Sequence, residues 1–415
     1  MRILVLGSGG REHAIARALH LDPVVTALHV APGNAGTLEI AHNHVLDPTD
    51  PVAVTELAAR LRPELVVIGP EAPLTTGVAD ALRQAGVPVF GPDRAAARIE
   101  GSKAFAKEIM AAAGVPTADS RVCESSREVD EALDAFGPPY VVKDDGLAAG
   151  KGVVVTEDRD EAVRHAASCG RVVIEDFLDG PEVSLFALSD GNSAVPLLPA
   201  QDFKRAYDGD RGPNTGGMGA YTPLPWAPPG LVDEVMATVV QPTIDELRRR
   251  ETPYVGVLYA GLALTSRGVR VVEFNARFGD PETQVVLDRL ATPLAGLLQA
   301  CAIGGLDPAT RLEWHPGAAV TVVVAAENYP ASPVKGDVIE GLAEAAAVPG
   351  AYVLHAGTKL DEEGRVVANG GRVLNVVGTG PDLAAARATA YDAAFKIRLR
   401  GSHHRTDIAL QASQG

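Results

Sequence analysis

Cysteine is scarce in this chain, and long apolar runs are absent. The three cysteines, Cys123, Cys169 and Cys301, lie far apart in the 415 residues, which excludes a disulfide framework and a CxxC metal site. No apolar stretch reaches the ~18 residues that a membrane-spanning helix requires. The first residues, MRILVLGSGGREHA, begin as a strand and lack the layout of a signal peptide. We therefore expect a cytoplasmic protein without a membrane-spanning segment.

Basic residues are also in the minority. The chain has 37 Lys and Arg against 53 Asp and Glu, a formal net charge of −16, and no block of Lys or Arg. Non-specific binding to nucleic acid or to an anionic membrane is not expected, because both depend on positive charge. The length suggests two to four domains with an ample core. We expect a monomer whose partners are small molecules.

The most informative segment is YVVKDDGLAAGKGVVVTED, residues 140–158. It is not a Walker A loop, because Lys151 is followed by Gly152 rather than by a Ser or Thr that could bind Mg²⁺. Apolar, β-branched runs on both sides predict a strand, a glycine-rich loop and a second strand. The N–H groups of such a loop can cover phosphates while a lysine supplies charge. The alternative is an ordinary hairpin with a solvated lysine.

The first hundred residues alternate predicted strands and helices, which indicates a parallel α/β domain. A dinucleotide-binding fingerprint is excluded, because Glu12 occupies the third glycine position. Gly9 and Gly10 nevertheless precede a helix, and with the charge of Arg11 they form a suitable phosphate site. The alternative is a tight turn between strand and helix.

The rest of the chain divides into a central region and a C-terminal domain. A helix is predicted from Ser102 to Gly114, and a long, looser stretch at residues 199–226 is expected to be functional. Near residue 318 the pattern changes to a small α+β domain. The predicted divisions are an N-terminal domain at residues 1–102, a central region at residues 103–317 and a C-terminal domain at residues 318–415.

The segment RVVEFNARFGDPE carries candidate metal ligands. Glu273 and Asn275 are two residues apart on a predicted strand, so their side chains share one face with Arg277. Carboxylate and amide oxygens suit Mg²⁺ or Mn²⁺, and the arginine can neutralise charge on a transferred phosphoryl group. Asp280 is the predicted N-cap of the next helix, with Pro281 at its first position. Taken alone, the pattern also fits a polar outer face.

A third polar segment, VVIEDFLDGPEVS, follows a strand of the buried type. It contains Glu175, the apolar pair Phe177 and Leu178, and Glu182. A backbone hinge at this place can bind an adenine edge while Glu182 accepts hydrogen bonds from ribose hydroxyls. A strand–turn–strand with exposed acids is the alternative.

Taken in order, these segments resemble the ATP-grasp ligases, and among them the phosphoribosylamine–glycine ligase family. The resemblance covers nearly the whole chain and rests on the strings GSGGREHA, GPEAPLTTG, KDDGLAAGKGV, AQDFKRAYDGDRGPNTGGMGAY, EFNARFGDPE and HAGT with GGRVL. The chain departs from the family pattern at Asp144, where Ala is common, and at Phe203, where His is common. The resemblance implies a multidomain α/β and α+β fold. Its parts would be an N-terminal parallel α/β domain, central ATP-grasp domains with a mobile subdomain at about residues 120–190, and a small C-terminal α+β domain.

The resemblance also implies a reaction in purine biosynthesis. ATP would phosphorylate the carboxylate of glycine, and the amine of 5-phosphoribosylamine would then displace phosphate from glycyl phosphate. Phosphorylation supplies the leaving group, so the enzyme mainly positions reactants and neutralises charge. The segment around Lys151 would be a mobile cover over the ATP phosphates, and the loop at Gly9 would hold the ribose 5-phosphate.

The site residues that the resemblance implies fall into four groups. Catalysis would involve Arg277, Lys143 and Lys151. ATP would contact Lys103, Lys143, Gly150, Lys151, Glu175, Phe177, Leu178 and Glu182. The other substrates would contact Gly9, Gly10, Arg11, Glu71 and Asp210, and Mg²⁺ or Mn²⁺ would be bound by Glu273 and Asn275.

Two other functions remain open from the sequence. One is a different ATP-grasp ligase, such as a carboxylase of purine intermediates, against which GPNTGGMGAY and GSGGREHA argue. The other is a nucleotide-binding sensor without catalysis, which would have lost a lysine or the metal pair. Neither has been lost here.

Overall fold

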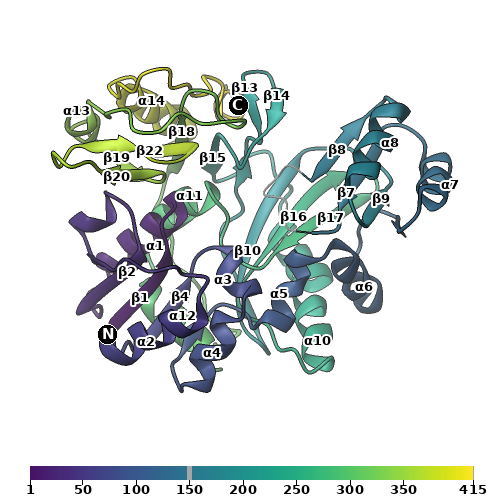
Figure 1. Cartoon of the computed structure of the whole chain (residues 1–415), viewed down its shortest axis with the longest axis horizontal. Helices are drawn as coiled ribbons and strands as arrows, with labels where there is room; N and C mark the ends of the chain where they lie inside the picture. The colour runs from purple at the N-terminus through teal and green to yellow at the C-terminus, as the bar shows by residue number, and fades with distance from the viewer. Residues whose placement is uncertain (147–151, 415) are drawn as a thin grey trace.

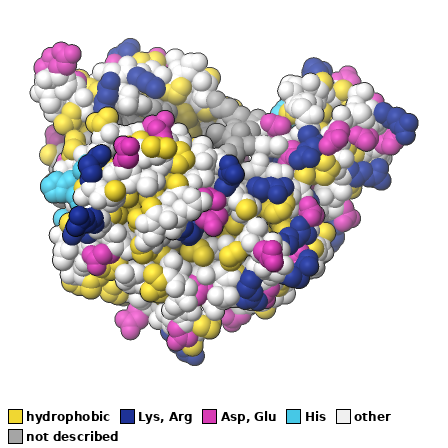
Figure 2. All heavy atoms as spheres, turned by 60° about the horizontal axis from the view of Figure 1, so that its bottom comes forward, with side chains coloured by type: hydrophobic (Ala, Val, Ile, Leu, Met, Phe, Trp, Pro, Cys, Tyr) yellow, Lys and Arg dark blue, Asp and Glu magenta, His cyan; other side chains and the backbone are white. Residues whose placement is uncertain are grey.

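The computed structural model describes residues 1–146 and 152–414. In Figure 1 the N-terminal elements lie at one side beneath the C-terminal elements, and residues 120–146 and 152–175 project on the other side. The space-filling view in Figure 2 shows the surface hollowed between this projecting part and the rest of the molecule. The fold is multidomain α/β and α+β, as predicted.

The N-terminal domain is built on a parallel sheet in the order β3-β2-β1-β4-β5. Its central strands are apolar and buried on both faces because helices cover them. The strands are β1 Arg2–Gly7, β2 Ala27–Pro32, β3 His42–Asn43, β4 Leu65–Ile68 and β5 Val89–Phe90. The helices are α1 Gly10–His20, α2 Pro51–Leu61, α3 Glu71–Thr75, α4 Val78–Gln84 and α5 Arg94–Gly101.

The projecting part is an antiparallel sheet in the order β6-β9-β7-β8 with two helices on it. Its elements are β6 Ser120–Cys123, α7 Ser126–Phe136, β7 Tyr140–Asp144, β8 Val153–Thr156, α8 Arg159–Ser168 and β9 Val172–Glu175. We call it the small sheet. Because β7 pairs with β8 from Tyr140↔Thr156 to Lys143↔Val153, the two predicted strands are confirmed, whereas the glycine-rich segment at 147–151 lies outside the described residues. The small sheet ends at Glu175, so the last fifteen residues of the expected 120–190 subdomain belong mostly to the next sheet.

The large central sheet has the order β11-β10-β16-β17. Its strands are β10 Glu182–Asp190, β11 Ala194–Pro196, β16 Val255–Thr265 and β17 Gly268–Asn275. The helices of this region are α6 Lys103–Ala113, α9 Leu231–Val235, α10 Gln241–Arg249, α11 Glu282–Arg289 and α12 Leu294–Ala302, with a π-helical turn at Met236–Val240. Helix α6 starts and stops as predicted, because the Ser102 hydroxyl accepts from the Phe105 N–H and Gly114 takes a left-handed conformation.

A five-stranded sheet, β12-β15-β18-β22-β19, joins the central and C-terminal regions. It contains β12 Gln201–Asp202, β15 Gly219–Thr222, β18 Ala318–Ala325, β19 Ala351–His355 and β22 Arg372–Gly380, flanked by α13 Leu342–Ala346 and α14 Leu383–Ala394. Two small hairpins complete the region, β13 Arg205–Tyr207 with β14 Arg211–Asn214, and β20 Thr358–Leu360 with β21 Val366–Ala368. The looser stretch expected at 199–226 is therefore wrong in detail, since β12, β13, β14 and β15 give it regular pairing.

Aromatic packing fixes the N-terminal domain on the large sheet. The ring of Phe278 lies 6.0 Å from Phe90 of β5 and 5.9 Å, edge-on, from Phe186 of β10. All three rings are almost fully buried, so the turn after β17 is held between the two domains. Within the described residues, no helix combines the length and apolarity needed to cross a membrane.

Candidate active site

Strand β17 presents the acid–amide pair predicted from the sequence. Glu273 pairs with Gly261 and Asn275 with Tyr259 of β16, so the two side chains lie on one face. Arg277 follows the end of the strand, and its Nη2 donates to Asn275 Oδ1 over 3.2 Å. The structure thus brings the three predicted residues together.

Positive charge surrounds Glu273. Burial alone would raise its pKa, but the ammonium groups of Lys204 and Lys143 lead the charges that hold the pKa of Glu273 below its ordinary value. Lys103 and Arg277 act in the same direction. The carboxylate is therefore ionised in the neutral range, and four cations face the place where polyphosphate charge would be bound.

Lys143 links the small sheet to β17. Its Nζ lies 2.7 Å from Glu175 Oε2 and donates to the Val272 carbonyl over 3.0 Å. Lys107 of α6 lies 3.1 Å from the other carboxylate oxygen of Glu175. Glu175 thus pairs with the buried Lys143 and the partly buried Lys107, and both of its carboxylate oxygens are used. Sequence reasoning did not single out Lys107, although it lies one helical turn after Lys103 on α6.

The entrance to the glycine-rich loop is anchored to α6. Asp145 accepts from the N-cap hydroxyl of α6 over 3.0 Å, and Lys103 Nζ donates to the Gly146 carbonyl over 3.2 Å. Lys103 thus lies beside the start of the glycine-rich segment, and its contact with phosphate stays a prediction. Gly150 and Lys151, the other residues expected at the phosphates, lie outside the described residues.

The segment after β9 holds the residues expected at the nucleoside. Phe177 is 45% exposed and Leu178 is half-buried, so an apolar surface is open to a ring there. Glu182 is exposed at the start of β10 and forms an ion pair with Lys204. A ribose hydroxyl at Glu182 would share the carboxylate with this lysine.

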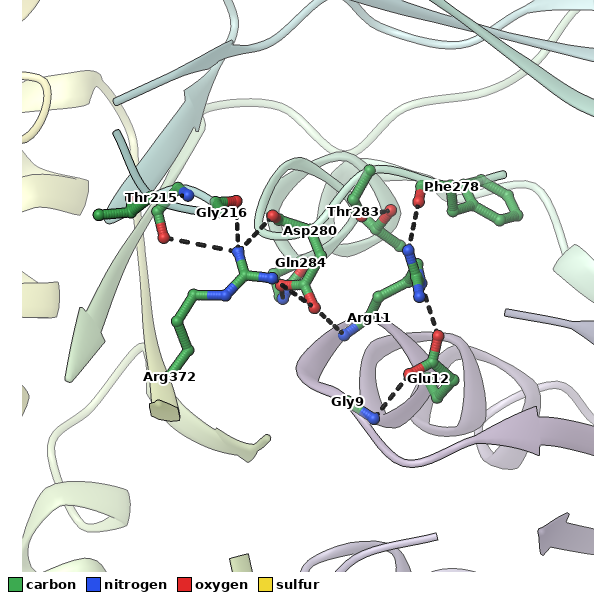
Figure 3. Close-up of polar contacts among 12 residues, drawn as sticks. Gly9, Arg11, Glu12, Thr215, Gly216, Phe278, Asp280, Thr283, Gln284 and Arg372 are labelled. Atoms are coloured by element: carbon green, nitrogen blue, oxygen red, sulfur yellow. Dashed lines mark hydrogen bonds and ion pairs between the residues drawn. The ribbon is translucent and has the colours of Figure 1, made fainter. Parts of the chain in front are cut away.

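Three segments far apart in the sequence meet at the start of α1 (Figure 3). Arg11 is 7% exposed, forms an ion pair with Glu12, and donates from Nη1 to the Phe278 carbonyl over 3.0 Å. The Asp280 Oδ2 accepts from the Arg11 N–H over 3.4 Å and lies 3.4 Å from Nη2 of Arg372 on β22. We call this meeting point the three-part junction, since each domain supplies at least one residue.

The glycines of this loop are required by close approach. A Cβ on Gly10 would come within 2.2 Å of Asn375 Nδ2, and the N–H of Gly9 donates to Glu12 Oε2 over 2.6 Å. The Asn375 side chain is fully buried, and among the described residues it has no hydrogen-bond partner. The loop is thus more tightly packed than a plain strand-to-helix turn.

The predicted N-cap of α11 is wrong. The helix begins at Glu282 with Pro281 in the N-cap position and no side-chain cap. The Asp280 carboxylate is used elsewhere, since it accepts from Gln284 Nε2 over 2.8 Å and faces Arg11 and Arg372 across the junction. A local capping rule did not predict this long-range use of the side chain.

Arg277 connects the β17 face to the N-terminal domain. Its Nη2 lies 3.1 Å from Glu100 Oε1 and its Nε lies 3.4 Å from Glu71 Oε2. Burial would lower the pKa of Arg277, but Glu100 and Glu71 outweigh it and raise that pKa. Arg277 is therefore a permanent cation. Glu71, expected at a substrate, is paired with it.

Asp210 lies apart from this set. It is in the turn between β13 and β14, 71% exposed, and its Oδ1 lies 2.7 Å from Arg405 Nη1. Nothing in the contacts of the described residues joins Asp210 to Glu71 or to Gly9. The same Arg405 lies over the ring of Phe203, with the guanidinium carbon 4.9 Å from the ring centroid.

Several residues of the site were missed by sequence reasoning. They are Glu12, Glu100, Lys107, Asp202, Lys204, Glu282 and Arg372. Most of them lie within the strings that carried the family resemblance, but no periodicity or spacing gives their partners.

Three protein-family models match this chain. Models of the phosphoribosylglycinamide synthetase N domain, ATP-grasp (A) domain and C domain match residues 1–100, 101–283 and 319–411. A phosphoribosylamine–glycine ligase of Streptomyces coelicolor is 66% identical over 415 residues, covering 100% of both chains. One of Mycobacterium tuberculosis is 57% identical over 424 residues, covering 100% of this chain and 99% of that protein.

A comparison with solved structures gives the same family. A phosphoribosylamine–glycine ligase of Thermotoga maritima superposes with a TM-score of 0.84 at 35% identity, covering 99% of this chain and 100% of that one. The biotin carboxylase domain of a Hydrogenobacter thermophilus 2-oxoglutarate carboxylase superposes at 0.74 with 17% identity, covering 97% and 91%, which shows a shared fold. With its three domains matched and full-length relatives well above 30% identity, this chain belongs to the phosphoribosylamine–glycine ligase family.

Proposed function

We propose that this chain ligates glycine to 5-phosphoribosylamine at the expense of ATP, giving glycinamide ribonucleotide, ADP and phosphate in purine biosynthesis. The observation that carries the proposal is the β17 face, where Glu273, Asn275 and Arg277 lie near three lysines from separate parts of the chain. Membership of the family supports the choice of substrates, and the arrangement of these side chains is suited to phosphoryl transfer to a carboxylate.

The first step is attack of a glycine carboxylate oxygen on the γ-phosphorus of ATP, with ADP leaving. Lys103 and Lys143 are placed to neutralise the phosphates, and Gly150 with Lys151 is proposed to complete their cover. Arg277 remains charged throughout because Glu100 and Glu71 stabilise its cationic form, so it can stabilise the charge that develops on the transferred group. Phe177, Leu178 and Glu182 are proposed to bind the nucleoside.

The oxygen donors of β17 fit Mg²⁺ or Mn²⁺. Within the described residues no group of three or more His, Cys, Asp or Glu could hold a metal ion, and Mg²⁺ commonly uses only one or two protein ligands together with phosphates and water. Glu273 and Asn275 would hold the metal, which when bound neutralises charge on the phosphates. The position of Glu273 among cations keeps its carboxylate ionised for this role.

In the second step the amine attacks the carbonyl carbon of glycyl phosphate, and inorganic phosphate leaves with the former carboxylate oxygen. We propose that the ribose 5-phosphate lies at the start of α1, where Gly9 and Gly10 precede the helix and Arg11 adds charge. Glu71 and Asp210 are proposed to contact the substrates as well. Because Arg11 and Glu71 are already paired within the protein, they would share their charges with the ligand.

The test is production of ADP and phosphate by the purified protein. We expect both products only when glycine and 5-phosphoribosylamine are present together with ATP and Mg²⁺ or Mn²⁺. ATP binding without turnover would indicate a sensor, and bicarbonate-dependent turnover would indicate a carboxylase. Sedimentation and cell fractionation would check the further expectations of a monomer and of a cytoplasmic location.

A further inference from the structure

The end of the chain holds the β13–β14 hairpin, and the steps above give this contact no function. In Figure 1 the hairpin lies beside the C-terminal end of the chain. Arg405, near that end, is 1% exposed, although an arginine side chain is always charged. Its Nη1 lies 2.7 Å from Asp210 Oδ1 in the turn of the hairpin, and its Nε and Nη2 each donate to the Asp407 carboxylate over 2.7 Å. The buried charge is therefore paired with one carboxylate of the hairpin and one of its own segment.

Two backbone N–H groups strengthen this attachment. The Gly209 N–H in the hairpin turn donates to Asp407 Oδ2 over 2.8 Å, and the Thr406 N–H donates to Asp208 Oδ1 over 2.7 Å. Asp407 thus binds the guanidinium group of Arg405 and the hairpin turn at the same time. Because hydrogen bonds run in both directions between the two segments, the hairpin and the end of the chain are held as one unit.

Arg405 also contacts the two residues that flank Lys204. Its guanidinium carbon lies 4.9 Å from the ring centroid of Phe203, and its Nη1 donates to the Arg205 carbonyl over 3.2 Å. A guanidinium group over an aromatic face is a stabilising contact. Because Phe203 and Arg205 are the direct neighbours of Lys204 in the chain, the backbone position of Lys204 depends on Arg405.

The ammonium group of Lys204 lies over the β17 face. Lys204 forms an ion pair with Glu182 on β10. Glu182 pairs with Ala263 of β16, and Gly261, two residues earlier on the same strand, pairs with Glu273. Directly opposite residues, and residues two apart on one strand, share a face of the sheet, so Lys204 and Glu273 lie on the same side of it. The charge of Lys204 is accordingly the largest of those that lower the pKa of Glu273.

We propose that Arg405 is a positioning residue, which holds the backbone on both sides of Lys204 so that its ammonium group faces the phosphates at the β17 face. Lys204 would then stabilise negative charge on the transferred phosphoryl group together with Arg277. The C-terminal domain would thereby contribute to phosphoryl transfer without touching a reactant. This inference rests on the proposed function and adds one phosphate-binding residue and its support. It involves no covalent step.

The experiment is a double-mutant cycle with Arg405→Gln and Lys204→Met, measured as ADP formation at saturating glycine, 5-phosphoribosylamine, ATP and Mg²⁺. Lys204→Met should lower kcat about 10²-fold, because it removes a cation beside the transferred group. Arg405→Gln should lower kcat about 10-fold, because it displaces Lys204. In the double variant kcat should equal that of Lys204→Met within about 2-fold, since Arg405 then has no ammonium group left to position.

Arg387→Gln is the matched control. Arg387 on α14 also binds the end of the chain, since its Nε donates to the Ile408 carbonyl over 3.0 Å, and its guanidinium carbon lies 4.6 Å from the ring centroid of Tyr391. Within residues 1–146 and 152–414, its hydrogen bonds go to the end of the chain and none goes to the hairpin. Arg387→Gln should therefore lower the thermal midpoint, as Arg405→Gln should, but leave kcat unchanged.

A second variant decides if Arg405→Gln does not fold. Phe203→Leu removes the ring under the guanidinium group and leaves all charges in place. It should lower kcat about 3-fold in the otherwise unchanged enzyme and have no effect beside Lys204→Met.

The outcomes separate this inference from the proposed function. An unchanged kcat in folded Arg405→Gln, losses that multiply in either double variant, or equal kcat losses in Arg387→Gln and Arg405→Gln would overturn the inference while leaving the ligase activity intact. If the unchanged enzyme forms no ADP in response to glycine and 5-phosphoribosylamine, the proposed function fails and the inference falls with it.

Discussion

The small sheet and the three-part junction hold their parts in place by opposite means. The small sheet has its own apolar core under α7 and α8, and the ion pairs on its outer side, such as Arg159 with Asp130, are exposed. Its buried pair, Lys143 with Glu175, lies where the sheet meets α6 and β17. The junction instead joins buried charges, with Arg11 and Asp280 contributed by domains far apart in the sequence. An outer ion pair of the small sheet can therefore be lost without uncovering a buried charge, whereas an ion pair of the junction cannot.

The largest effect is expected on β17. Glu273→Ala or Asn275→Ala should lower turnover by at least ~10²-fold, because charge on the transferred phosphoryl group would lose its stabilisation. Thermal unfolding should change little for Glu273→Ala, since Glu273 is only partly buried, and more for Asn275→Ala, since Asn275 is buried. Steady-state assays at saturating metal ion would measure this, and turnover at the normal rate would contradict the metal assignment.

A change at the junction tests its buried charges. Arg11→Ala should cost about 3 kcal/mol of folding free energy, because it leaves the buried carboxylate of Glu12 without its cation. It should also raise the KM for 5-phosphoribosylamine and leave that for ATP nearly unchanged. Denaturant unfolding and initial rates are the measurements. The double variant Arg11→Leu with Glu12→Gln, which removes both charges, is the control and should recover much of the stability.

Local patterns account for what the sequence could predict. Valine runs on both sides of a glycine loop are enough to predict β7 and β8, and the two-residue alternation of Glu273 and Asn275 predicts their shared face. Both depend on neighbours within a few positions. The same holds for α6, whose start at Ser102 and end at Gly114 follow from capping.

Long-range contacts account for what it could not predict. Asp280 has the residue type and position of an N-cap, but its carboxylate faces Arg372, which lies 92 positions later in the chain. Glu175 looked like a nucleoside ligand, and its partners Lys107 and Lys143 come from other elements. Asp202 was passed over because its strand, β12, exists only through pairing with β15. Rules that consider only neighbouring residues cannot predict which of several possible partners such a side chain will contact.

A smaller effect is expected from pH, and it sharpens the contrast between buried and exposed acids. Asp202 has its pKa raised to about 7 by burial, with Glu282 and Glu182 acting in the same direction and Lys204 opposing it. It is protonated below that pH and loses its negative charge beside Lys204, so kcat/KM of the ligase reaction should change as the pH passes through about 7. In Asp202→Asn this limb should be lost from the pH profile. The same limb in both enzymes would assign it to another group.

The smallest effect is expected for a substitution on the outer side of the small sheet. A large effect there would contradict the comparison between the small sheet and the junction. Arg159 lies 3.0 Å from Asp130 and 2.8 Å from Asp134, so the geometry is that of a paired side chain. These three side chains are nevertheless 38%, 55% and 72% exposed, and water and salt screen such pairs almost completely. Arg159→Ala should therefore leave the thermal midpoint and the KM for ATP unchanged at physiological salt. Differential scanning calorimetry beside Arg11→Ala makes the comparison direct, because both variants remove an arginine with two polar partners and differ chiefly in burial. A midpoint that falls as far for Arg159→Ala as for Arg11→Ala would mean that the outer ion pairs of the small sheet stabilise the fold as strongly as the buried pairs of the junction, and the contrast between exposed and buried charges would be lost.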